Sequence, residues 1–363
     1  MRFAIVGAGP AGLAAAHSLR DADVAVTVFE KSRGLSGRAA TRWRDAEDLR
    51  GQPFRWRYDH GAQYLSPEAD SDVARLVRAV VPEADLVEID GAVWPFDDDG
   101  TLRPDRARPE AGLRWTLRDG IADLGRRLAD ATPGLDLRLQ TRVASLARDG
   151  ATWTVEVADG DPEAGFDAVL VTAPAPQAAD LLRASRLGEA DGAALVAALT
   201  EADYRAQFSV VWAFDREVDR PEGVYALVNA DEHGASGGGH AVAWLAVESD
   251  KPNRAPAGAS LLIAQMAPAW TEAHYDADRA DVVAAATEAV AGLLGALPDP
   301  LWTDTQRWRY ALPNAQADAE ALQAASGHGL FFAGDFTAAK GRVHLALEQG
   351  TEAARRMLLG RGQ

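Results

Sequence analysis

The stretch RFAIVGAGPAGLAAAHSL, residues 2–19, decides the fold. Its first five residues are typical of a short buried strand, and the alanine-rich part is typical of a helix. Between the two, Gly7, Gly9 and Gly12 form a GxGxxG pattern. Glycines at this spacing permit a tight turn, close approach of the backbone to a pyrophosphate and close packing of the helix on the strand. The stretch therefore predicts a Rossmann-like domain with the phosphates of a dinucleotide at the helix N-terminus.

A second strand-like segment supports dinucleotide binding. VAVTVFE, residues 24–30, ends in Glu30, 23 residues beyond Gly7, where an acid can hold the ribose hydroxyls. The loop KSRGLSGRAATRW, residues 31–43, follows where an NAD domain normally continues into another helix. Its glycines and Arg38 could bring backbone N–H groups and a guanidinium to a second phosphate, although a mobile basic loop would have the same composition. This loop favours FAD over NAD.

The C-terminal region closes the same predicted site. GLFFAGDF, residues 329–336, is typical of a buried strand that ends in Gly-Asp, and a helical pattern follows over residues 341–358. Asp335 could bind a ribityl hydroxyl or a phosphate, or could simply cap a helix. The N-terminus of the following helix could face the pyrimidine edge of a flavin, where negative charge collects on reduction.

Composition excludes several classes of function. The 37 basic and 54 acidic residues give a net charge of −17, which argues against general affinity for nucleic acid or anionic membranes. There is no cysteine, so disulfides, thiolate metal sites and a cysteinyl-linked cofactor are excluded. The longest apolar pattern, from Val282, is too short to span a bilayer and contains Glu288. We expect a cytoplasmic protein with no membrane and no nucleic-acid partner.

The middle of the chain has a different texture. Residues 205–270 contain four strand-like runs separated by Gly, Pro and Asp turns, which predicts a mainly antiparallel sheet, and ASGGG at 235–239 is predicted to be a hairpin tip. The predicted fold class is α/β, a Rossmann-like FAD-binding domain with an inserted substrate domain built on a mainly antiparallel sheet. We expect residues 1–75, 120–182 and 303–363 in the FAD-binding domain and residues 76–119 and 183–302 in the substrate domain.

Together these motifs resemble the FAD-dependent amine oxidase superfamily. The resemblance rests on GAGPAGLAAA, GLSGR, YDHGAQY and FFAGDF followed by GRVHLALEQG. Within the superfamily the chain is most similar to the renalase-like branch, through KSRGLSGRAATR, DHGAQY, RWRYALP and ESDKPNR. One departure is Ser36, where the superfamily usually has the first glycine of a Gly-Gly-Arg. This serine puts the contact of the loop with the pyrophosphate in doubt.

The resemblance implies a set of cofactor residues for non-covalent FAD, distributed over the whole chain. In chain order these are Gly7, Gly9, Ala11, Gly12, Glu30, Lys31, Gly37, Arg38, Gly61, Ala62, Gln63, Val143, Ala173, Pro174, Gly334, Asp335, Arg342 and Val343. The segment around Asp59 and His60 would pass the isoalloxazine ring, with Gly61 admitting the ring and Gln63 offering an amide. Val143, Ala173 and Pro174 could equally be ordinary core residues.

Asp59 and His60 could in principle form a metal site or an acid/base pair. In extended backbone, however, adjacent side chains point to opposite faces, so the two cannot act as a pair. No second histidine or acid stands at a metal-ligand spacing and there is no thiol, so no metal is expected. We therefore interpret His60 as a hydrogen-bonded wall residue beside the flavin rather than a base, with histidyl attachment of the flavin as a lesser alternative.

The resemblance also implies a reaction. Renalases oxidise the 2- and 6-dihydro isomers of NAD(P)H to NAD(P)+, with O2 reduced to hydrogen peroxide. Such a substrate needs a flat aromatic slot, and the candidates for its walls and for its phosphates are His60, Tyr64, Trp308, Tyr310, Lys251 and Arg254. The alternatives are an amine or polyene oxidase of the same superfamily, in which Lys251 would hold a water at the flavin, and a flavin-binding protein without turnover.

Overall fold

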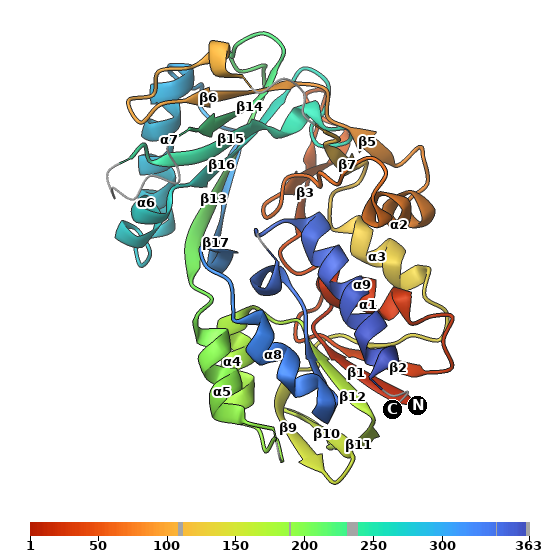
Figure 1. The fold of residues 1–363 in the computed structure, drawn as a ribbon. Coiled ribbons are helices and arrows are strands. Elements are labelled where there is room, and N and C mark those ends of the chain that lie inside the picture. Colours follow the sequence, from red (N-terminus) through yellow and green to blue (C-terminus); the bar gives the residue numbers. More distant parts are fainter. Residues whose placement is uncertain (108–111, 189, 231–238, 339, 361–363) are drawn as a thin grey trace.

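The computed structural model describes residues 1–107, 112–188, 190–230, 239–338 and 340–360. Its lower part contains a five-stranded parallel sheet (Figure 1). The strand order is β18 (Leu330–Phe332), β12 (Ala168–Val171), β1 (Arg2–Val6), β2 (Ala25–Phe29) and β8 (Asp136–Arg138). The strand pattern predicted for residues 2–6 and 24–30 is therefore present. Three segments far apart in the chain build this one sheet.

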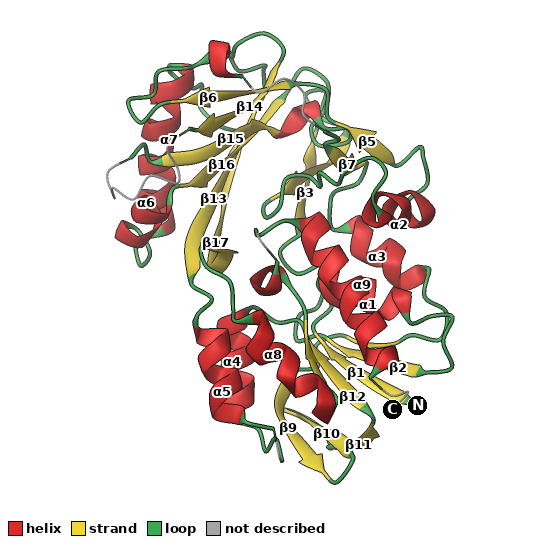
Figure 2. Cartoon of the chain, in the orientation of Figure 1, coloured by secondary structure: helices red, strands yellow, loops and turns green. Residues whose placement is uncertain are grey.

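Helices cover both faces of the parallel sheet (Figure 2). One face packs against α1 (Pro10–Ser18), α3 (Asp123–Asp130) and α9 (Val343–Leu359), with α2 (Asp72–Val80) outside them. The other face packs against α4 (Ala175–Arg183), α5 (Gly192–Thr200), α8 (Ala319–Ala324) and a small sheet of β9 (Val143–Asp149), β10 (Thr152–Val157) and β11 (Glu163–Phe166). Successive side chains of each strand point to opposite faces of the sheet. Because both faces are covered, most residues of these strands are apolar.

The upper part is a six-stranded sheet that is antiparallel except for one parallel pair. Its order is β17 (Trp302–Pro313), β13 (Tyr204–Phe214), β16 (Ser260–Met266), β15 (Val242–Val247), β14 (Val224–Asn229) and β6 (Ala92–Phe96). The predicted fold class is confirmed. The hairpin expected at residues 235–239 falls almost entirely outside the described residues.

Two layers cover this second sheet. One face packs against α7 (Arg279–Leu294), the core helix that the sequence predicts from Val282, and α6 (Pro268–Ala273) lies beside β13. The other face packs against the hairpin of β3 (Thr41–Glu47) and β4 (Pro53–Asp59), and the short pair β5 (Leu86–Glu88) and β7 (Trp115–Leu117) lies next to it. Among the described residues, no helix has the length and apolarity that crossing a membrane requires.

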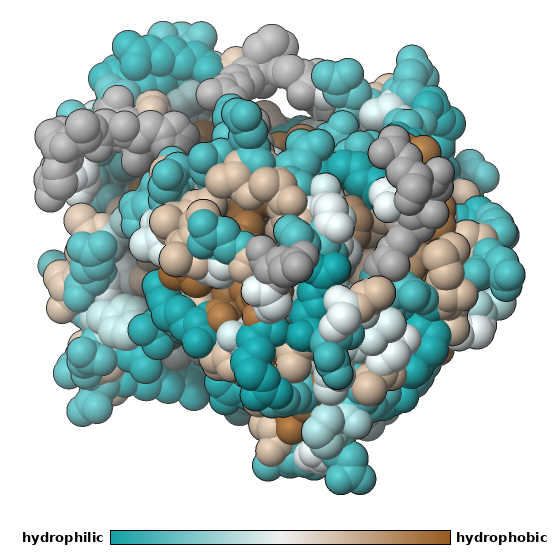
Figure 3. All heavy atoms as spheres, turned by 60° about the horizontal axis from the view of Figure 1, so that its bottom comes forward, coloured by the Kyte–Doolittle hydropathy of each residue, from teal (hydrophilic) through white to brown (hydrophobic). Residues whose placement is uncertain are grey.

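One expected domain boundary needs revision. Strand β17 pairs with β13 from Trp302 to Pro313, so these residues belong to the six-stranded sheet, whereas residues 303–313 were expected in the FAD-binding domain. We propose that the last cofactor segment starts near residue 314. The long strands β13 and β17 run together from the upper sheet toward the helices of the lower part (Figure 1). Hydrophilic residues cover much of the face shown in Figure 3, with smaller hydrophobic areas between them.

Candidate functional site

The first glycine turn is built as the GxGxxG pattern predicts. Gly7 has φ +111°, a conformation that glycine adopts readily, and its N–H donates to Phe29 O at 2.8 Å. A Cβ on Gly12 would lie 2.0 Å from Gly7 O, so only glycine permits this approach of helix and turn. Thr172, which the sequence analysis missed, donates its hydroxyl to the carbonyls of Val6 and Gly7 at 3.0 and 3.1 Å. The hydroxyl, one residue beyond the neighbouring strand β12, fixes the turn.

The second glycine loop lies directly against the first. Ser36 N donates to Ala8 O at 2.9 Å, and a Cβ on Gly37 would be 3.5 Å from the Cα of Gly9. A Cβ on Gly9 would meet nothing within 4 Å. Gly9 is also the N-cap of α1 and provides no capping side chain, so the first N–H groups of the helix stay available to a ligand. The two loops therefore leave open space beside a helix N-terminus.

Ser36 has a packing role that explains the departure at this position. Its side chain is buried, donates to Ala122 O at 2.8 Å and accepts from Gly125 N at 3.1 Å. Its φ is +74°, which is unfavourable for a serine, and the two hydrogen bonds offset that cost. A Cβ on Gly125 would lie 2.1 Å from Ser36 Oγ. The hydroxyl thus points toward α3 and is not available to a cofactor, and the N–H of Ser36 is already donated to Ala8 O.

Two substitutions of Ser36 separate the contribution of its two side-chain hydrogen bonds from the cost of its positive φ. Ser36→Ala loses both hydrogen bonds and keeps the strained backbone, so we expect a loss of about 1–3 kcal/mol in the free energy of unfolding. Ser36→Gly loses the same bonds but relieves the positive φ, so it should be more stable than the alanine variant by about 1 kcal/mol. Urea denaturation of both variants measures the difference. An alanine variant as stable as the wild type would contradict the assigned role of the hydroxyl.

Glu30 lies at the end of β2, as predicted, and its carboxylate is already engaged. Oε2 accepts from Ala8 N at 2.9 Å and Oε1 accepts from Ser32 N at 2.7 Å. A carboxylate has about four acceptor positions, so two remain for ribose hydroxyls. Lys31 is exposed and donates to Gln177 Oε1 at 2.9 Å. Val143, Ala173 and Pro174 are half-buried, which fits either a cofactor wall or ordinary core.

Arg38 and Asp335, expected to contact separate parts of FAD, are paired with each other. Arg38 Nη1 lies 2.5 Å from Asp335 Oδ2, and Nη2 lies 2.8 Å from Oδ1. The same guanidinium donates to the carbonyls of Tyr310 and Ala311. Tyr204, which the sequence analysis missed, donates its hydroxyl to Asp335 Oδ1 at 2.7 Å, and burial followed by the Asp335 charge raises the pKa of Tyr204. This network joins the second glycine loop to the long strands β13 and β17.

Asp59 belongs to a fully buried cluster of four charges, made of Asp59, Glu248, Lys251 and Arg254 and called here the ion quartet. Lys251 Nζ lies 3.1 Å from Asp59 Oδ2 and 2.7 Å from Glu248 Oε2. Arg254 Nη2 lies 3.0 Å from Asp59 Oδ2, and its Nε lies 3.1 Å from Glu248 Oε1. Burial would raise the pKa of Asp59, but Arg254 and Lys251 hold it well below its usual range. Burial raises the pKa of Glu248.

The ion quartet corrects the expectation for Arg254 and Lys251. Arg254 also donates to the carbonyls of Arg118 and Leu117, and its side chain is fully buried, so it cannot reach a substrate phosphate. Lys251 is likewise fully buried and donates to Gln63 Oε1 at 3.4 Å. Gln63, expected to offer its amide to the flavin, instead donates to the carbonyl of Asp59. These residues form the support behind the His60 segment.

His60 and Trp308 form a flat stacked pair. Their ring centroids are 5.3 Å apart with an interplanar angle of 10°, and Trp308 Nε1 donates to His60 O at 2.8 Å. Burial, with Arg42 nearby, lowers the pKa of His60 to about 4, so the imidazole is neutral at pH 7. Its Nδ1 is buried without a hydrogen-bond partner. The opposed side chains of Asp59 and His60 thus serve different environments, a charge cluster and an aromatic wall.

The glycine beside His60 has a different role from the one expected. A Cβ on Gly61 would lie 2.0 Å from Arg38 O, so its missing side chain accommodates backbone rather than the flavin ring. Ala62 N donates to that same carbonyl at 3.0 Å. At the start of α9, Val343 is buried, while Arg342 is exposed and donates to Gly341 O. His344, which the sequence analysis missed, accepts from Ser66 N at 3.3 Å.

Tyr64 and Tyr310 do not lie in one wall with the His60 and Trp308 pair. The Tyr64 ring is 5.9 Å from Trp244, which in turn is 6.3 Å from Tyr225. Tyr310 lies edge-on to Tyr204 at 6.0 Å. The buried indole Nε1 of Trp244 and the hydroxyl of Tyr225 have no hydrogen-bond partner. The predicted aromatic residues therefore form three groups, and Trp244 and Tyr225 extend one of them.

The comparisons agree with this geometry. Residues 100–358 match the model of the family described as flavin containing amine oxidoreductase, and residues 5–80 match that of an NAD(P)-binding Rossmann-like domain. The chain belongs to the flavin-containing amine oxidoreductase family. The expected superfamily is thereby confirmed, while the renalase-like branch stays a prediction.

Solved structures show how widely the amine oxidoreductase fold is shared. One described as "Putative protoporphyrinogen oxidase", from Exiguobacterium sp. 255-15, has 17% identity and a TM-score of 0.75, with 99% of each chain covered. Wild-type putrescine oxidase bound to putrescine has 15% identity and a TM-score of 0.70, again with 99% of each chain covered. Reduced UDP-galactopyranose mutase has 12% identity and a TM-score of 0.73, with coverage of 100% of this chain and 94% of the other. At these identities the likeness establishes the fold alone.

Membership of this family makes the protein an FAD-dependent oxidoreductase with non-covalently bound FAD. The alternative of a flavin-binding protein without turnover is therefore set aside. The residues fit the cofactor, because the space at Gly9 lies beside the free helix N-terminus and Glu30 retains acceptor positions for a ribose. When bound, FAD supplies a hydride acceptor. The protein contributes orientation, hydrogen bonds and exclusion of water.

Proposed function

We propose that the protein is an oxidase of the renalase-like branch, which takes a hydride from a 2- or 6-dihydro isomer of NAD(P)H and passes the electrons to O2 to give hydrogen peroxide. The observation that supports this most is the parallel His60 and Trp308 pair. A flat aromatic pair beside the loop of Gly37 and Arg38, whose Arg38 carbonyl accepts from Ala62 N, suits a planar dihydronicotinamide ring. Because His60 is neutral at pH 7, it adds no positive charge that would oppose the charge of the nicotinamidium product.

The charged groups near this pair support a reaction without a protein base. Lys251 and Asp59 are paired within the ion quartet. Arg42 lies 2.5 Å from Asp304, which also accepts from the hydroxyl of Tyr58 at 2.7 Å. A dihydronicotinamide gives its hydride directly and needs no deprotonation. Positioning of its ring and exclusion of water are then the main contributions of the protein.

An amine oxidase of the same family is the second candidate. The group of Tyr64, Trp244 and Tyr225 favours it, since aromatic side chains can enclose an amine and two of them carry unpartnered polar atoms. Lys251 counts against a reaction that requires a lysine-held water, because its ammonium is buried between Asp59 and Glu248. In this reading Tyr64 and Trp244 would bind substrate, and His60 and Trp308 would only support them.

Anaerobic rapid mixing distinguishes the two candidates. The FAD-loaded protein is mixed with 2-, 6- and ordinary 4-dihydro-NAD(P) and, separately, with putrescine, and loss of oxidised flavin absorbance is followed. We expect fast bleaching by the 2- or 6-isomer and little by the 4-isomer or the diamine. Bleaching by the amine alone would replace the first candidate by the second. Bleaching by none of them would overturn both.

The pH dependence of the same reaction is a second discriminator. The pKa of His60 is lowered to about 4, and a dihydronicotinamide ring has no group that titrates near neutrality. We therefore expect a flavin reduction rate that is flat between about pH 5 and 8. An alkylamine reacts as the neutral base and has a pKa near ~10, so its rate should rise about tenfold per pH unit over this range. A steep rise would contradict the dihydronicotinamide assignment.

Trp308→Ala tests the flat wall directly. The change removes the ring that stacks on His60 and the hydrogen bond to His60 O, so flavin reduction by the preferred isomer should slow by about 10- to 100-fold. Trp308→Phe keeps an aromatic face and should lose much less. Trp270→Ala is a matched control, because Trp270 of α6 stacks on His274 on the far face of the sheet. Equal rates in the wild type and Trp308→Ala would remove this residue from the site.

A further inference from the structure

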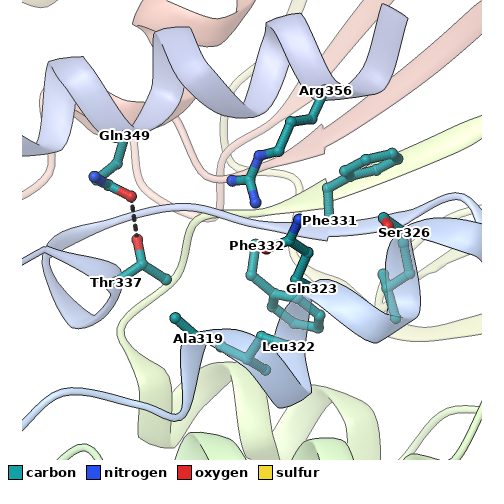
Figure 4. Close-up of a pocket in the computed structure, with 10 residues that line it drawn as sticks. Ala319, Leu322, Gln323, Ser326, Phe331, Phe332, Thr337, Gln349 and Arg356 are labelled. Atoms are coloured by element: carbon teal, nitrogen blue, oxygen red, sulfur yellow. Dashed lines mark hydrogen bonds between the residues drawn. The ribbon is translucent and has the colours of Figure 1, made fainter. Parts of the chain in front are cut away.

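A cavity of about 70 Å³ lies outside the site described above, at the open edge of the parallel sheet. It is open to solvent on part of its surface and lies between α9 on one side and α8 with the short helix η3 (Ala325–His328) on the other, with β18 between them (Figure 4). In the described chain β18 pairs only with β12, so its other edge has no strand beside it. The cavity is therefore bordered by a strand edge with which no other described strand pairs.

The lining combines one cation with neutral polar groups. Arg356 of α9 and Gln323 of α8 point into the cavity from opposite sides, with Ser326 nearby (Figure 4). Arg356 is the only charged residue among the described residues that line it. Its Nε is buried without a hydrogen-bond partner. The carboxylate of Glu352 is 4.0 Å from this nitrogen and also contacts Arg355, so the Arg356 side chain, which is 30% exposed, has no close ion pair among the described residues.

The strand edge adds backbone donors to this lining. Gly329 O accepts from Val169 N and Ala333 N donates to Val171 O, so alternate residues of this strand face β12. In a parallel ladder the residues between them, Leu330 and Phe332, direct their N–H and C=O groups to the other side. Both residues line the cavity. A guanidinium, an amide, a hydroxyl and strand-edge N–H groups together form a setting for an anion.

We propose that this cavity binds a small monocarboxylate with a short alkyl part. Its volume is enough for about five water-sized groups, which matches a carboxylate with two or three carbons. Arg356 would pair with the carboxylate. Leu322, Phe331 and Phe332 would contact the alkyl part. The single positive charge of Arg356 neutralises a monocarboxylate, whereas a phosphate with two negative charges would keep one of them uncompensated.

The cavity is also joined to the turn that carries Asp335. Thr337 Oγ1 lies 3.0 Å from Gln349 Oε1 and 3.0 Å from Gly334 O, and both Thr337 and Gln349 line the cavity. Binding should therefore be measured on the FAD-loaded protein, because Asp335 is one of the residues predicted to contact the cofactor.

The experiment is calorimetric titration of the FAD-loaded protein with propionate, for the wild type, Arg356→Gln and Arg355→Gln. Loss of a charge-assisted pair should weaken binding about tenfold or more in Arg356→Gln. The neighbouring Arg355 does not line the cavity, so its variant should change affinity less than about twofold, the effect of a screened surface charge. The uncharged analogue 1-propanol should bind at least about tenfold more weakly than propionate.

A second variant protects the test against a folding defect of Arg356→Gln. Gln323→Glu keeps nearly the same shape and places a carboxylate opposite Arg356, so it should abolish propionate binding by occupying the cation. Absence of saturable propionate binding to the wild type would overturn the proposal. So would equal affinity in the wild type, Arg356→Gln and Gln323→Glu, since propionate would then be bound elsewhere.

Discussion

Replacing Arg254 by methionine should lower the free energy of unfolding by about 3–5 kcal/mol, the usual cost of breaking a buried ion pair on one side. The ion quartet contains two carboxylates and two cations, all without solvent exposure. Without Arg254, one buried negative charge is uncompensated, and the carbonyls of Arg118 and Leu117 lose a donor. Chemical denaturation of the FAD-loaded variant measures the loss.

Arg220→Met is the matched control for this prediction. Arg220 makes a bidentate contact with Asp250, but the two side chains are 31% and 29% exposed. A pair of this kind contributes about 0–1 kcal/mol, because water solvates the remaining carboxylate after the substitution. An equal loss in the free energy of unfolding for Arg254→Met and Arg220→Met would mean that burial does not make the ion quartet important. The proposed role of the ion quartet as a support for the His60 segment would then be wrong.

The cofactor half of the fold could be predicted because its signals are local. Gly7, Gly9 and Gly12 stand within six residues, and the clearest requirement, that of Gly12, is a contact with the carbonyl of Gly7 five positions earlier. The position of Glu30 follows from the length of one helix and one strand. Such features depend on backbone sterics and helix geometry, which the sequence carries without knowledge of distant segments.

The ion quartet could not be predicted in the same way. Asp59 and Glu248 are separated by 189 positions, and neither DHG nor ESDKPNR contains a sign that the two segments meet. Exposure is the expectation for Lys251 and Arg254, since charged side chains are rarely buried unless they are paired. The partners are known only once β4 lies against the six-stranded sheet. The same reason explains why Tyr204 was missed as a partner of Asp335.

Strand β17 shows a different limit of sequence reasoning. Its apolar and polar residues alternate imperfectly, as WTDTQRWRYALP, and most of its side chains are only half-buried. Its assignment to the six-stranded sheet comes from pairing with β13 over Trp302–Pro313. Pairing of this kind joins residues about 100 positions apart. The local periodicity of apolar residues in the sequence carries no information about which distant strand will pair.

Gly9→Ala should separate cofactor binding from folding more cleanly than any other change in the glycine loops. Gly9 has φ −77° and a Cβ there meets nothing within 4 Å, so the free energy of unfolding without FAD should change by less than about 1 kcal/mol. In the complex the methyl group would occupy the space left for close approach of the pyrophosphate. We expect FAD affinity to fall by about 10- to 100-fold, measured by quenching of flavin fluorescence on titration.

Two further glycines make this prediction specific to the space at Gly9. Gly34→Ala also adds a methyl group in open space, but on the exposed side of the second loop, so FAD affinity should stay within about twofold. Gly12→Ala would place a Cβ 2.0 Å from Gly7 O, and it should destabilise the protein itself by several kcal/mol, about what overpacking costs. Unchanged FAD affinity in Gly9→Ala would mean that the pyrophosphate does not lie between the two glycine loops. That result would move the cofactor away from the GxGxxG turn, since the helix N-terminus and the facing Gly37 loop define this space together.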